Sequence, residues 1–345
     1  MLHKPTAGSE WWRSGVIYQI YPRSFADYNG DGMGDLRGIT ERLDKLAELG
    51  IDAVWLSPFY TSPQKDAGYD VADYRNVDPL FGDLSDFDEL IARAHSLGIR
   101  VMIDLVPNHT SDQHEWFQKA LSAGPGSKER GYYHFKKGKG VNSELPPNNW
   151  QSMFGGPAWT RVEDGQWYVH LFDSSQPDLN WENPELRRAV YDMMNWWLDK
   201  GVAGFRMDVI NLISKVPGLP DGEQYPGDEF GNGFPLTANG PRLSEFLQEM
   251  HSEVFGHRDD VFLTVGECPG IGAEFATEIT NPSNAMLDMV FQFEHMDLDS
   301  QSGQGKWALK PLHLPDLKAS LSRWQSGLHG QGWNSLYWNN HDQPR

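Results

Sequence analysis

Three carboxylates stand at the ends of short apolar runs that lie far apart in the sequence. Asp208 follows Gly-Phe-Arg-Met, Glu267 follows Thr-Val-Gly, and Asp342 follows Asn-Asn-His. Hydrolysis of a glycosidic bond with retention needs one carboxylate to attack the anomeric carbon and a second, about 5 to 5.5 Å away, to protonate the leaving oxygen. A single carboxylate at a strand end is more often a helix cap or an ion-pair partner. Three at matching positions, each beside Arg or His, favour a catalytic site.

The neighbours of these carboxylates suggest how the roles divide. In a strand the side chains alternate, so Arg206 and Asp208 are expected on one face, where the cation keeps Asp208 ionised as a nucleophile. Glu267 must instead hold a proton near neutral pH, which burial and a neighbouring carboxylate favour. Asp342 is the expected second-shell or substrate-distorting group.

Two histidines are candidates for substrate binding. His109 and His341 could each donate hydrogen bonds to sugar hydroxyls, and a packed or capping histidine is the alternative at either position.

Parallel strands joined by helices are the elements that must position these groups. Beta-branched or aromatic runs recur, each followed by a helical apolar stripe, which predicts a (β/α)8 TIM barrel with its catalytic groups at the carboxyl ends of the strands. The expected strands are 16–20, 53–57, 101–106, 204–208, 262–266, 289–293 and 335–338. The chain ends just after the seventh run, so we expect a barrel truncated after strand 7.

The helical stripes recur every three or four residues. They are Ile39, Leu43, Leu46 and Leu49; Phe87, Leu90, Ile91 and Ala94; Leu186, Val190, Met193 and Trp197; and Leu317, Leu321 and Trp324. Asn183 as cap, Pro184 at the first helical position and Gly201 beyond the end delimit the third of these.

Two segments interrupt the alternation of strands and helices. Residues 107–180 are rich in Gly, Pro, Asn and Trp and too long for an ordinary connection, which predicts a subdomain inserted after strand 3. The barrel would then comprise residues 1–106 and 181–345. Residues 217–241 are rich in Gly and Pro and are expected to form a loop over the site.

The composition excludes several classes of function. A formal net charge of −19 repels nucleic acid and anionic membrane surfaces. No apolar run approaches the length of a membrane span, and the first residues carry no charged-then-apolar leader, so we expect no membrane association and a cytoplasmic location. The single cysteine, Cys268, cannot form an internal disulfide. The 14 tryptophans are suited to core packing and to stacking on sugars, and packing is the expected use for most.

Four segments of the chain resemble the signature segments of the alpha-amylase family, in that family's order. They are Asp104-Leu-Val-Pro-Asn-His109, Gly204-Phe-Arg-Met-Asp208, Gly266-Glu267 and Asn340-His-Asp342. The resemblance implies that Asp208 is the nucleophile, Glu267 the acid/base and Asp342 the transition-state stabiliser. These are the roles that the residues themselves suggest.

Further segments resemble the oligo-1,6-glucosidase and alpha-glucosidase subgroup. The sequence of Gln176-Pro-Asp-Leu-Asn180 resembles the motif found in oligo-1,6-glucosidases. By resemblance, Asp66 binds the terminal glucose, Tyr69 is a stacking platform, and Phe172 and Gln176 line the same pocket. Val209, directly after the nucleophile, is typical of members that prefer alpha-1,6 linkages.

The segment from Asp27 to Asp35 has the spacing of a calcium loop. Asp27, Asn29, Asp31, Met33 through its carbonyl and Asp35 would present oxygen ligands at alternate positions. A solvated turn is the alternative. The resemblance also places a structural Ca²⁺, or sometimes Mg²⁺, in this loop, and no organic cofactor is expected.

The predicted function is release of terminal glucose from short, isomaltose-like oligosaccharides through a covalent glycosyl-Asp intermediate. The alternatives on the same residues are a maltase-type alpha-glucosidase, a trehalose-6-phosphate hydrolase and a sucrose isomerase. A non-catalytic barrel used for binding is an alternative from another class, and the presence of all three carboxylates argues against it. The sequence does not determine the oligomeric state.

Overall fold

A parallel sheet forms the centre of the molecule in the computed structural model, which describes residues 10–301 and 308–342. Within those residues the sheet has six strands in sequence order, each parallel to its neighbour. They are β1 (Ile17–Ile20), β2 (Ala53–Leu56), β5 (Arg100–Leu105), β9 (Gly204–Met207), β10 (Leu263–Glu267) and β11 (Met289–Phe291). The predicted α/β alternation is confirmed for these units.

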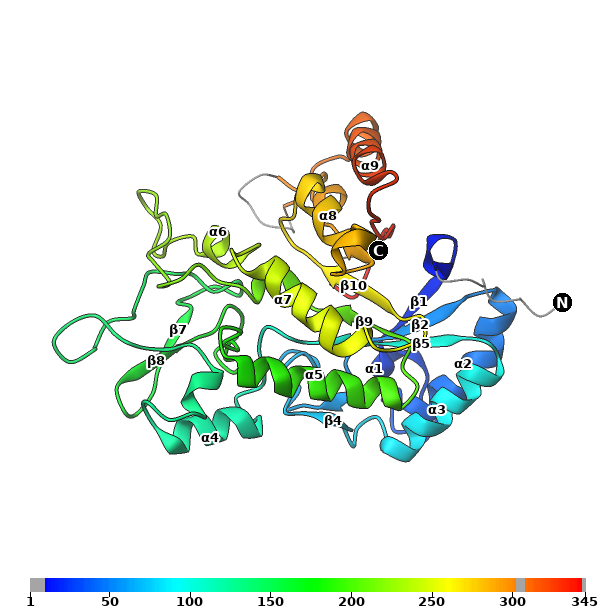
Figure 1. The fold of residues 1–345 in the computed structure, drawn as a ribbon, viewed down its shortest axis with the longest axis horizontal. Coiled ribbons are helices and arrows are strands. Elements are labelled where there is room, and N and C mark those ends of the chain that lie inside the picture. Colours follow the sequence, from blue (N-terminus) through cyan, green and yellow to red (C-terminus); the bar gives the residue numbers. More distant parts are fainter. Residues whose placement is uncertain (1–9, 302–307, 343–345) are drawn as a thin grey trace.

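Helices cover the outside of this sheet (Figure 1). The principal ones are α2 (Leu36–Leu49), α3 (Leu84–Ser96), α5 (Pro184–Asp199), α7 (Leu243–Met250), α8 (Ala273–Thr280) and α9 (Leu314–Leu328). In α5 the Asn183 side chain accepts from the Glu185 N–H at 2.9 Å, and Pro184 occupies the first turn as predicted. In α2 three of the predicted stripe residues are buried, whereas Leu49 is 68% exposed because it lies at the last turn.

The sheet curls strongly, as a barrel requires. Neighbouring strands lie about 4.8 Å apart, so β2 and β11, four places apart, would be about 19 Å from each other in a flat sheet. Instead the rings of Trp55 on β2 and Phe291 on β11 have centroids 5.8 Å apart. The inward-facing side chains of β2, β5, β10 and β11 form one apolar cluster with Trp11. The described sheet is therefore a strongly curled, open part of a barrel, consistent with the predicted truncated barrel.

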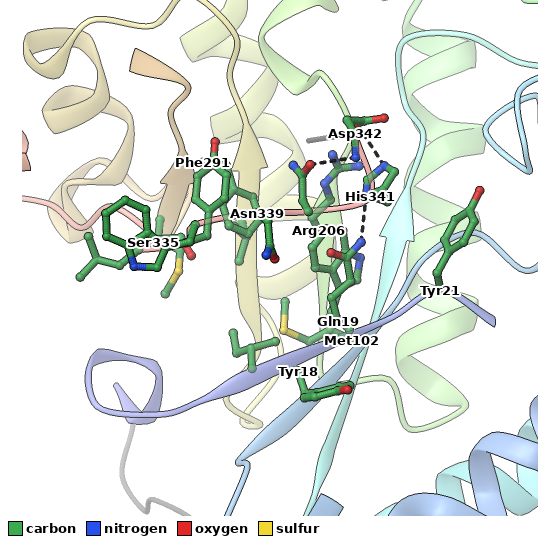
Figure 2. A pocket seen from close by; sticks show the side chains of 18 of the residues that line it. Tyr18, Gln19, Tyr21, Met102, Arg206, Phe291, Ser335, Asn339, His341 and Asp342 are labelled. Atoms are coloured by element: carbon green, nitrogen blue, oxygen red, sulfur yellow. Dashed lines mark hydrogen bonds and ion pairs between the residues drawn. The ribbon is translucent and has the colours of Figure 1, made fainter. Parts of the chain in front are cut away.

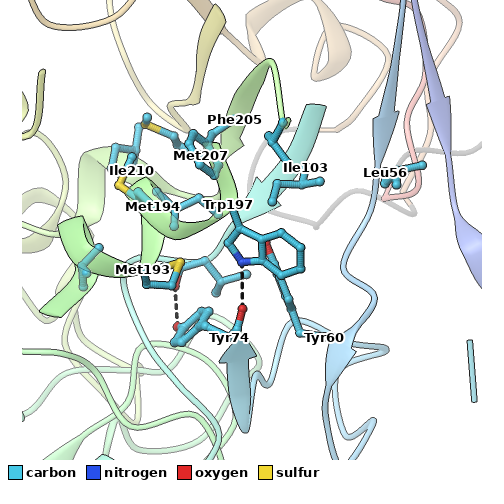
Figure 3. Close-up of a cluster of buried hydrophobic side chains, with 14 of the residues drawn as sticks. Leu56, Tyr60, Tyr74, Ile103, Met193, Met194, Trp197, Phe205, Met207 and Ile210 are labelled. Carbon is cyan, nitrogen blue, oxygen red and sulfur yellow. Dashed lines mark hydrogen bonds between the residues drawn. The ribbon is translucent and has the colours of Figure 1, made fainter. Parts of the chain in front are cut away.

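The opposite face of the sheet packs against the helices, and Figure 3 shows part of this core. Trp197 of α5 is fully buried, with its ring 4.9 Å from Phe87 and 5.5 Å from Phe59 between centroids. Its indole N–H donates to the Tyr74 carbonyl at 2.8 Å. Trp11, Trp150, Trp159, Trp181 and Trp324 are also fully buried, so packing is confirmed as the use of these tryptophans.

The predicted strand at residues 335–338 is wrong, because these described residues form no strand. One parallel bridge joins Asn334 to Val290, and the Ser335 N–H donates to the Val290 carbonyl at 2.8 Å. Beyond it the Tyr337 carbonyl contacts the His295 imidazole at 2.8 Å. The His295 side chain thus occupies the Tyr337 carbonyl, a backbone group that could otherwise accept a hydrogen bond from a neighbouring strand. Leu336 and Trp338 are each 65% exposed, and the Tyr337 ring packs edge-on against Phe291 of β11 with centroids 5.1 Å apart, so the segment contacts β11 through one side chain rather than through a ladder.

Residues 107–180 project from one end of the sheet and carry their own elements (Figure 1). They contain α4 (Glu115–Ala123) and an antiparallel sheet of β6 (Phe135–Lys137), β8 (Gln166–Val169) and β7 (Trp159–Arg161). The predicted loop at 217–241 packs against them, since the Trp150 indole donates to the Pro220 carbonyl at 2.8 Å. Trp150 and Leu219 share an apolar cluster with Val209, directly after Asp208. The domain boundaries at 107 and 180 stay a prediction.

Candidate active site

One buried arginine gathers carboxylates from three strands. The Arg206 guanidinium lies 2.6 Å from Asp104, 2.8 Å from Asp208 and 2.7 Å from Glu267, measured between nitrogen and oxygen. Arg206 comes from β9, Asp104 from β5 and Glu267 from β10, and Asp208 directly follows β9. We call these four residues the carboxylate cluster. The structure thus brings Asp208 and Glu267 together and places Arg206 beside Asp208, as the strand alternation predicts.

One cation cannot neutralise three carboxylates, and the electrostatics of the cluster reflect this. Burial and then the neighbouring Glu267 carboxylate raise the pKa of Asp208 well above its ordinary value, and the Arg206 charge opposes them. Burial also raises the pKa of Asp104. Our expectation that Arg206 keeps Asp208 ionised is therefore wrong, because desolvation and the adjacent carboxylate outweigh the cation.

A strained backbone position supports Glu267. The Val209 N–H donates to Glu267 Oε2 at 3.0 Å, the same oxygen that Arg206 contacts. Val209 has φ 37° and ψ 40°, a left-handed conformation that a beta-branched residue rarely adopts. Two donors on one oxygen fix the orientation of the Glu267 carboxyl group.

Asp342 reaches the site from a different direction and is less enclosed. Its side chain is 53% exposed and lies 3.1 Å from the His341 imidazole Nε2. A cavity of about 1080 Å³ is lined by Asp342, His341 and Arg206, and Figure 2 shows this region. The described lining residues include Arg206 but neither Asp208 nor Glu267. Asp342 therefore shares a cavity with the cation of the cluster.

The predicted sugar-binding residues form a connected chain beside the cluster. The Gln176 amide donates to Asp66 Oδ2 at 2.8 Å and lies 3.2 Å from His109 Nε2. The rings of His109 and Phe172 have centroids 5.0 Å apart. Burial lowers the pKa of His109 to about 4, so its imidazole is neutral at physiological pH. The structure brings these four residues together.

Tyr69 is close to the cluster, but one of its ring faces is covered. The phenol donates to Asp104 Oδ2 at 3.3 Å, and the ring is stacked on His341 with centroids 5.2 Å apart and planes 8° from parallel. We predicted that both Tyr69 and His341 contact the sugar. In the structure they contact each other.

Several residues of the site were not predicted. Asp104 and Trp55 are among them: the Trp55 indole donates to Asp104 Oδ2 at 2.8 Å, and the Arg206 guanidinium lies 5.1 Å from the centre of the Trp55 ring. Asp104 begins one of the four signature segments and is a lone charge within the apolar run Val-Met-Ile-Asp-Leu-Val, but no role was predicted for it. The buried Lys215 ammonium, 2.9 Å from Asp178, was also missed because one lysine in a sequence has no distinguishing spacing.

In residues 27–35, which we call the acidic loop, the side-chain carboxylates accept hydrogen bonds from backbone N–H groups of the same loop. Asp27 accepts from the Gly30 and Gly32 N–H groups at 2.6 and 2.8 Å, and Asp31 accepts from Met33 at 2.8 Å. Asp35 caps α2 by accepting from the Gly38 N–H at 2.7 Å.

The oxygen donors of the acidic loop have the chemistry that Ca²⁺ or Mg²⁺ prefers. Their arrangement fits less well, since over the described parts of the chain no three His, Cys, Asp or Glu side chains come together to hold a metal. Asn29 and Met33, the other predicted ligands, lie in the same loop, where Asn29 accepts from the Asp31 N–H at 2.9 Å.

Comparison with known proteins decides the family. The model of the alpha-amylase catalytic domain matches residues 19–345. The chain belongs to the alpha-amylase family.

Relatives within this family are similar over nearly the whole chain. An oligo-1,6-glucosidase of Halalkalibacterium halodurans is 54% identical over 338 residues, which cover 98% of this chain and 59% of the relative. An alpha-glucosidase of Pediococcus pentosaceus is 51% identical, covering 97% of this chain and 59% of the relative. The crystal structure of Bacillus licheniformis trehalose-6-phosphate hydrolase superimposes with a TM-score of 0.90 at 48% identity, over 97% of this chain and 59% of that one.

The family membership supports the predicted barrel and the predicted class of enzyme, a glycoside hydrolase. The chain spans about 59% of the length of these relatives. None of the helices in the described portion is both long and apolar enough to cross a membrane.

Proposed function

We propose that the protein is a retaining alpha-glucosidase that releases terminal glucose from short alpha-1,6-linked oligosaccharides. The observation that carries this proposal is the meeting of Asp208 and Glu267 on one buried guanidinium. Similarity to oligo-1,6-glucosidases over 98% of the chain supports the same reading.

Cleavage would proceed in two steps on this carboxylate pair. Asp208 attacks the anomeric carbon while Glu267 gives its proton to the leaving oxygen, and a glycosyl-Asp208 ester forms. Glu267, now ionised, then takes a proton from water, whose oxygen attacks the same carbon and frees Asp208. The Val209 N–H and Arg206 both contact Glu267 Oε2, which leaves Oε1 as the oxygen to donate the proton in the first step. Asp342 would stabilise the positive charge that develops on the sugar ring.

The cavity favours neutral disaccharides over phosphorylated ones. Of the described lining residues, the Lys and Arg side chains are Arg13 and Arg206. Arg13 is paired with Glu10 at 2.6 Å, and Arg206 is held by the carboxylate cluster. Asp66 and Asp342 add negative charge to the lining. A phosphate group would meet this negative charge, which argues against trehalose 6-phosphate as the substrate.

Asp208→Asn in the full-length protein is the direct test. We expect glucose release from isomaltose to fall by about 10⁴-fold or more, because the amide cannot form the ester. Undiminished release would contradict the nucleophile assignment. A panel of isomaltose, maltose, trehalose 6-phosphate and sucrose tests the linkage, and faster turnover of maltose would contradict the alpha-1,6 preference that Val209 supports.

We also propose that Ca²⁺ or Mg²⁺ stabilises the acidic loop without taking part in catalysis. The oxygen donors at 27, 29, 31, 33 and 35 support this. A cytoplasmic location is part of the proposal too, and the single buried thiol of Cys268 is consistent with a reducing compartment.

A further inference from the structure

The imidazole of His341 is enclosed between two tyrosine rings. Tyr21 stacks on it with centroids 5.9 Å apart and planes 11° from parallel, and Tyr69 stacks at 5.2 Å and 8°. Both tyrosines are fixed by their hydroxyl groups, Tyr21 donating to the Ala67 carbonyl at 2.8 Å and Tyr69 to Asp104 at 3.3 Å. With its two faces covered, the imidazole can form hydrogen bonds only in its own plane, through its two nitrogens.

Each ring nitrogen has one partner in that plane. Gln19 Nε2 lies 2.9 Å from His341 Nδ1, and Asp342 Oδ2 lies 3.1 Å from His341 Nε2. The same Gln19 nitrogen donates to the Ser57 hydroxyl at 3.0 Å, which orients the amide. Figure 2 shows Gln19, His341 and Asp342 joined in this order.

The chemistry of these partners selects one tautomer. An amide nitrogen has hydrogens to donate and no lone pair to accept with, so Nδ1 must present its lone pair to Gln19. The proton of the neutral imidazole is then on Nε2, where it points to the Asp342 carboxylate. With the other tautomer, Nδ1–H would face the amide N–H and Nε2 would present a lone pair to a carboxylate.

We propose that Gln19 is a positioning residue for glucoside cleavage, which fixes His341 as the Nε2–H tautomer and thereby holds the Asp342 carboxylate towards the cavity. The proposal rests on the proposed glucosidase function. It assigns a role to the first strand of the sheet, since Gln19 lies on β1 and contributes no charge to the reaction. Asp342 is 53% exposed and follows a segment without strand structure, and the His341 imidazole contacts its carboxylate directly at 3.1 Å.

Two substitutions separate this role from simple packing. Gln19→Leu keeps the bulk and removes the donor, and Gln19→Glu puts an acceptor in the same place. For Gln19→Leu in the full-length protein we expect kcat on isomaltose to fall by about 10- to 100-fold with a smaller change in KM, because the misplaced group acts in the transition state. Gln248→Leu is the matched control, since Gln248 is exposed on α7 and is not among the residues that line the cavity, and its kcat should be unchanged.

Nitrogen-15 NMR of labelled histidine reads the tautomer without reference to activity. We expect a protonated Nε2 and an unprotonated Nδ1 for His341 in the wild type, and a protonated Nδ1 in Gln19→Glu. A protonated Nδ1 in the wild type, or equal kcat for Gln19→Leu and the control, would overturn the proposal. A wild type that cleaves no alpha-glucoside would overturn the glucosidase function and the catalytic part of the proposal, whereas the tautomer assignment would still stand or fall on the spectrum.

Discussion

The carboxylate cluster and the acidic loop use the same residue type in opposite surroundings. In the cluster, burial is the largest cause that raises the pKa of Asp208, although a guanidinium lies 2.8 Å away. In the loop, the Gly32 N–H is the largest cause that lowers the pKa of Asp27, with no charged partner involved. A buried ion pair therefore does less to keep a carboxylate ionised than a few backbone N–H groups at the surface, because desolvation opposes the charge in the first case.

Removing the Arg206 cation from the carboxylate cluster should lower stability more than any other change considered below. Arg206→Met leaves three buried carboxylates without a counter-charge, so we expect the free energy of unfolding near pH 7 to fall by about 3 to 5 kcal/mol. Urea unfolding measures this. Arg93→Met is the control, since Arg93 pairs with Asp44 at 2.6 Å but the two side chains are 42% and 53% exposed, and the loss of stability should be much smaller. Equal losses would show that burial does not set the difference.

Asp288 is a partly buried carboxylate away from the cluster, and its hydrogen bonds come from Thr264 rather than from a cation. Burial raises its pKa to about 6, while its Oδ2 accepts from the Thr264 N–H and hydroxyl at 2.8 and 2.9 Å. Because the pKa of Asp288 is higher in the folded state than in the unfolded state, the folded state binds more protons between pH 4 and 6. The free energy of unfolding therefore falls as the pH rises from about 4 through about 6. Above that pH range, ionised Asp288 lowers the free energy of unfolding by about 3 kcal/mol.

Asp288→Asn removes this titration and keeps an acceptor for Thr264. We expect its stability to vary less than that of the wild type between pH 4 and 7, measured by thermal unfolding at constant ionic strength. Parallel pH profiles for the two proteins would contradict the assignment.

Asp70 is buried like the carboxylate cluster, but it accepts hydrogen bonds from neutral loop groups like the acidic loop. It accepts from the Ser62 hydroxyl and the Lys65 N–H at 2.9 Å and from the Asp66 N–H at 3.0 Å. Asp70→Ala leaves these donors unpaired, so we expect a loss of about 1 to 3 kcal/mol. Because Asp66 is displaced as well, KM for isomaltose should rise more than kcat falls. A change in kcat alone would contradict this role.

Removing a metal ion from the acidic loop should change stability least. We expect EDTA to lower the melting temperature of the full-length protein by a few degrees and excess Ca²⁺ or Mg²⁺ to restore it. Asp27→Ala should lower the melting temperature and abolish the response to EDTA, and kcat should be unchanged. A melting temperature that does not respond to chelation would remove the proposed ion.

The sequence alone determined the elements and the candidate residues. Apolar periods and caps predicted the strands and the bounds of α5, because these signals are local in the chain. Strand alternation predicted that Arg206 would lie beside Asp208. The run at 335–338 has the same local signal but forms no strand, since pairing depends on partners that a local pattern does not contain.

Tertiary structure alone decided how the site is charged and oriented. The pKa of Asp208 depends on how many carboxylates share Arg206 and how deeply they are buried, and both are sums over residues from several strands. The contacts of His341 with Gln19, 322 positions earlier, and with Tyr69 arise only when the sheet curls. Sequence spacing reports what lies along one strand, whereas desolvation and tautomer choice depend on everything that surrounds a group in space.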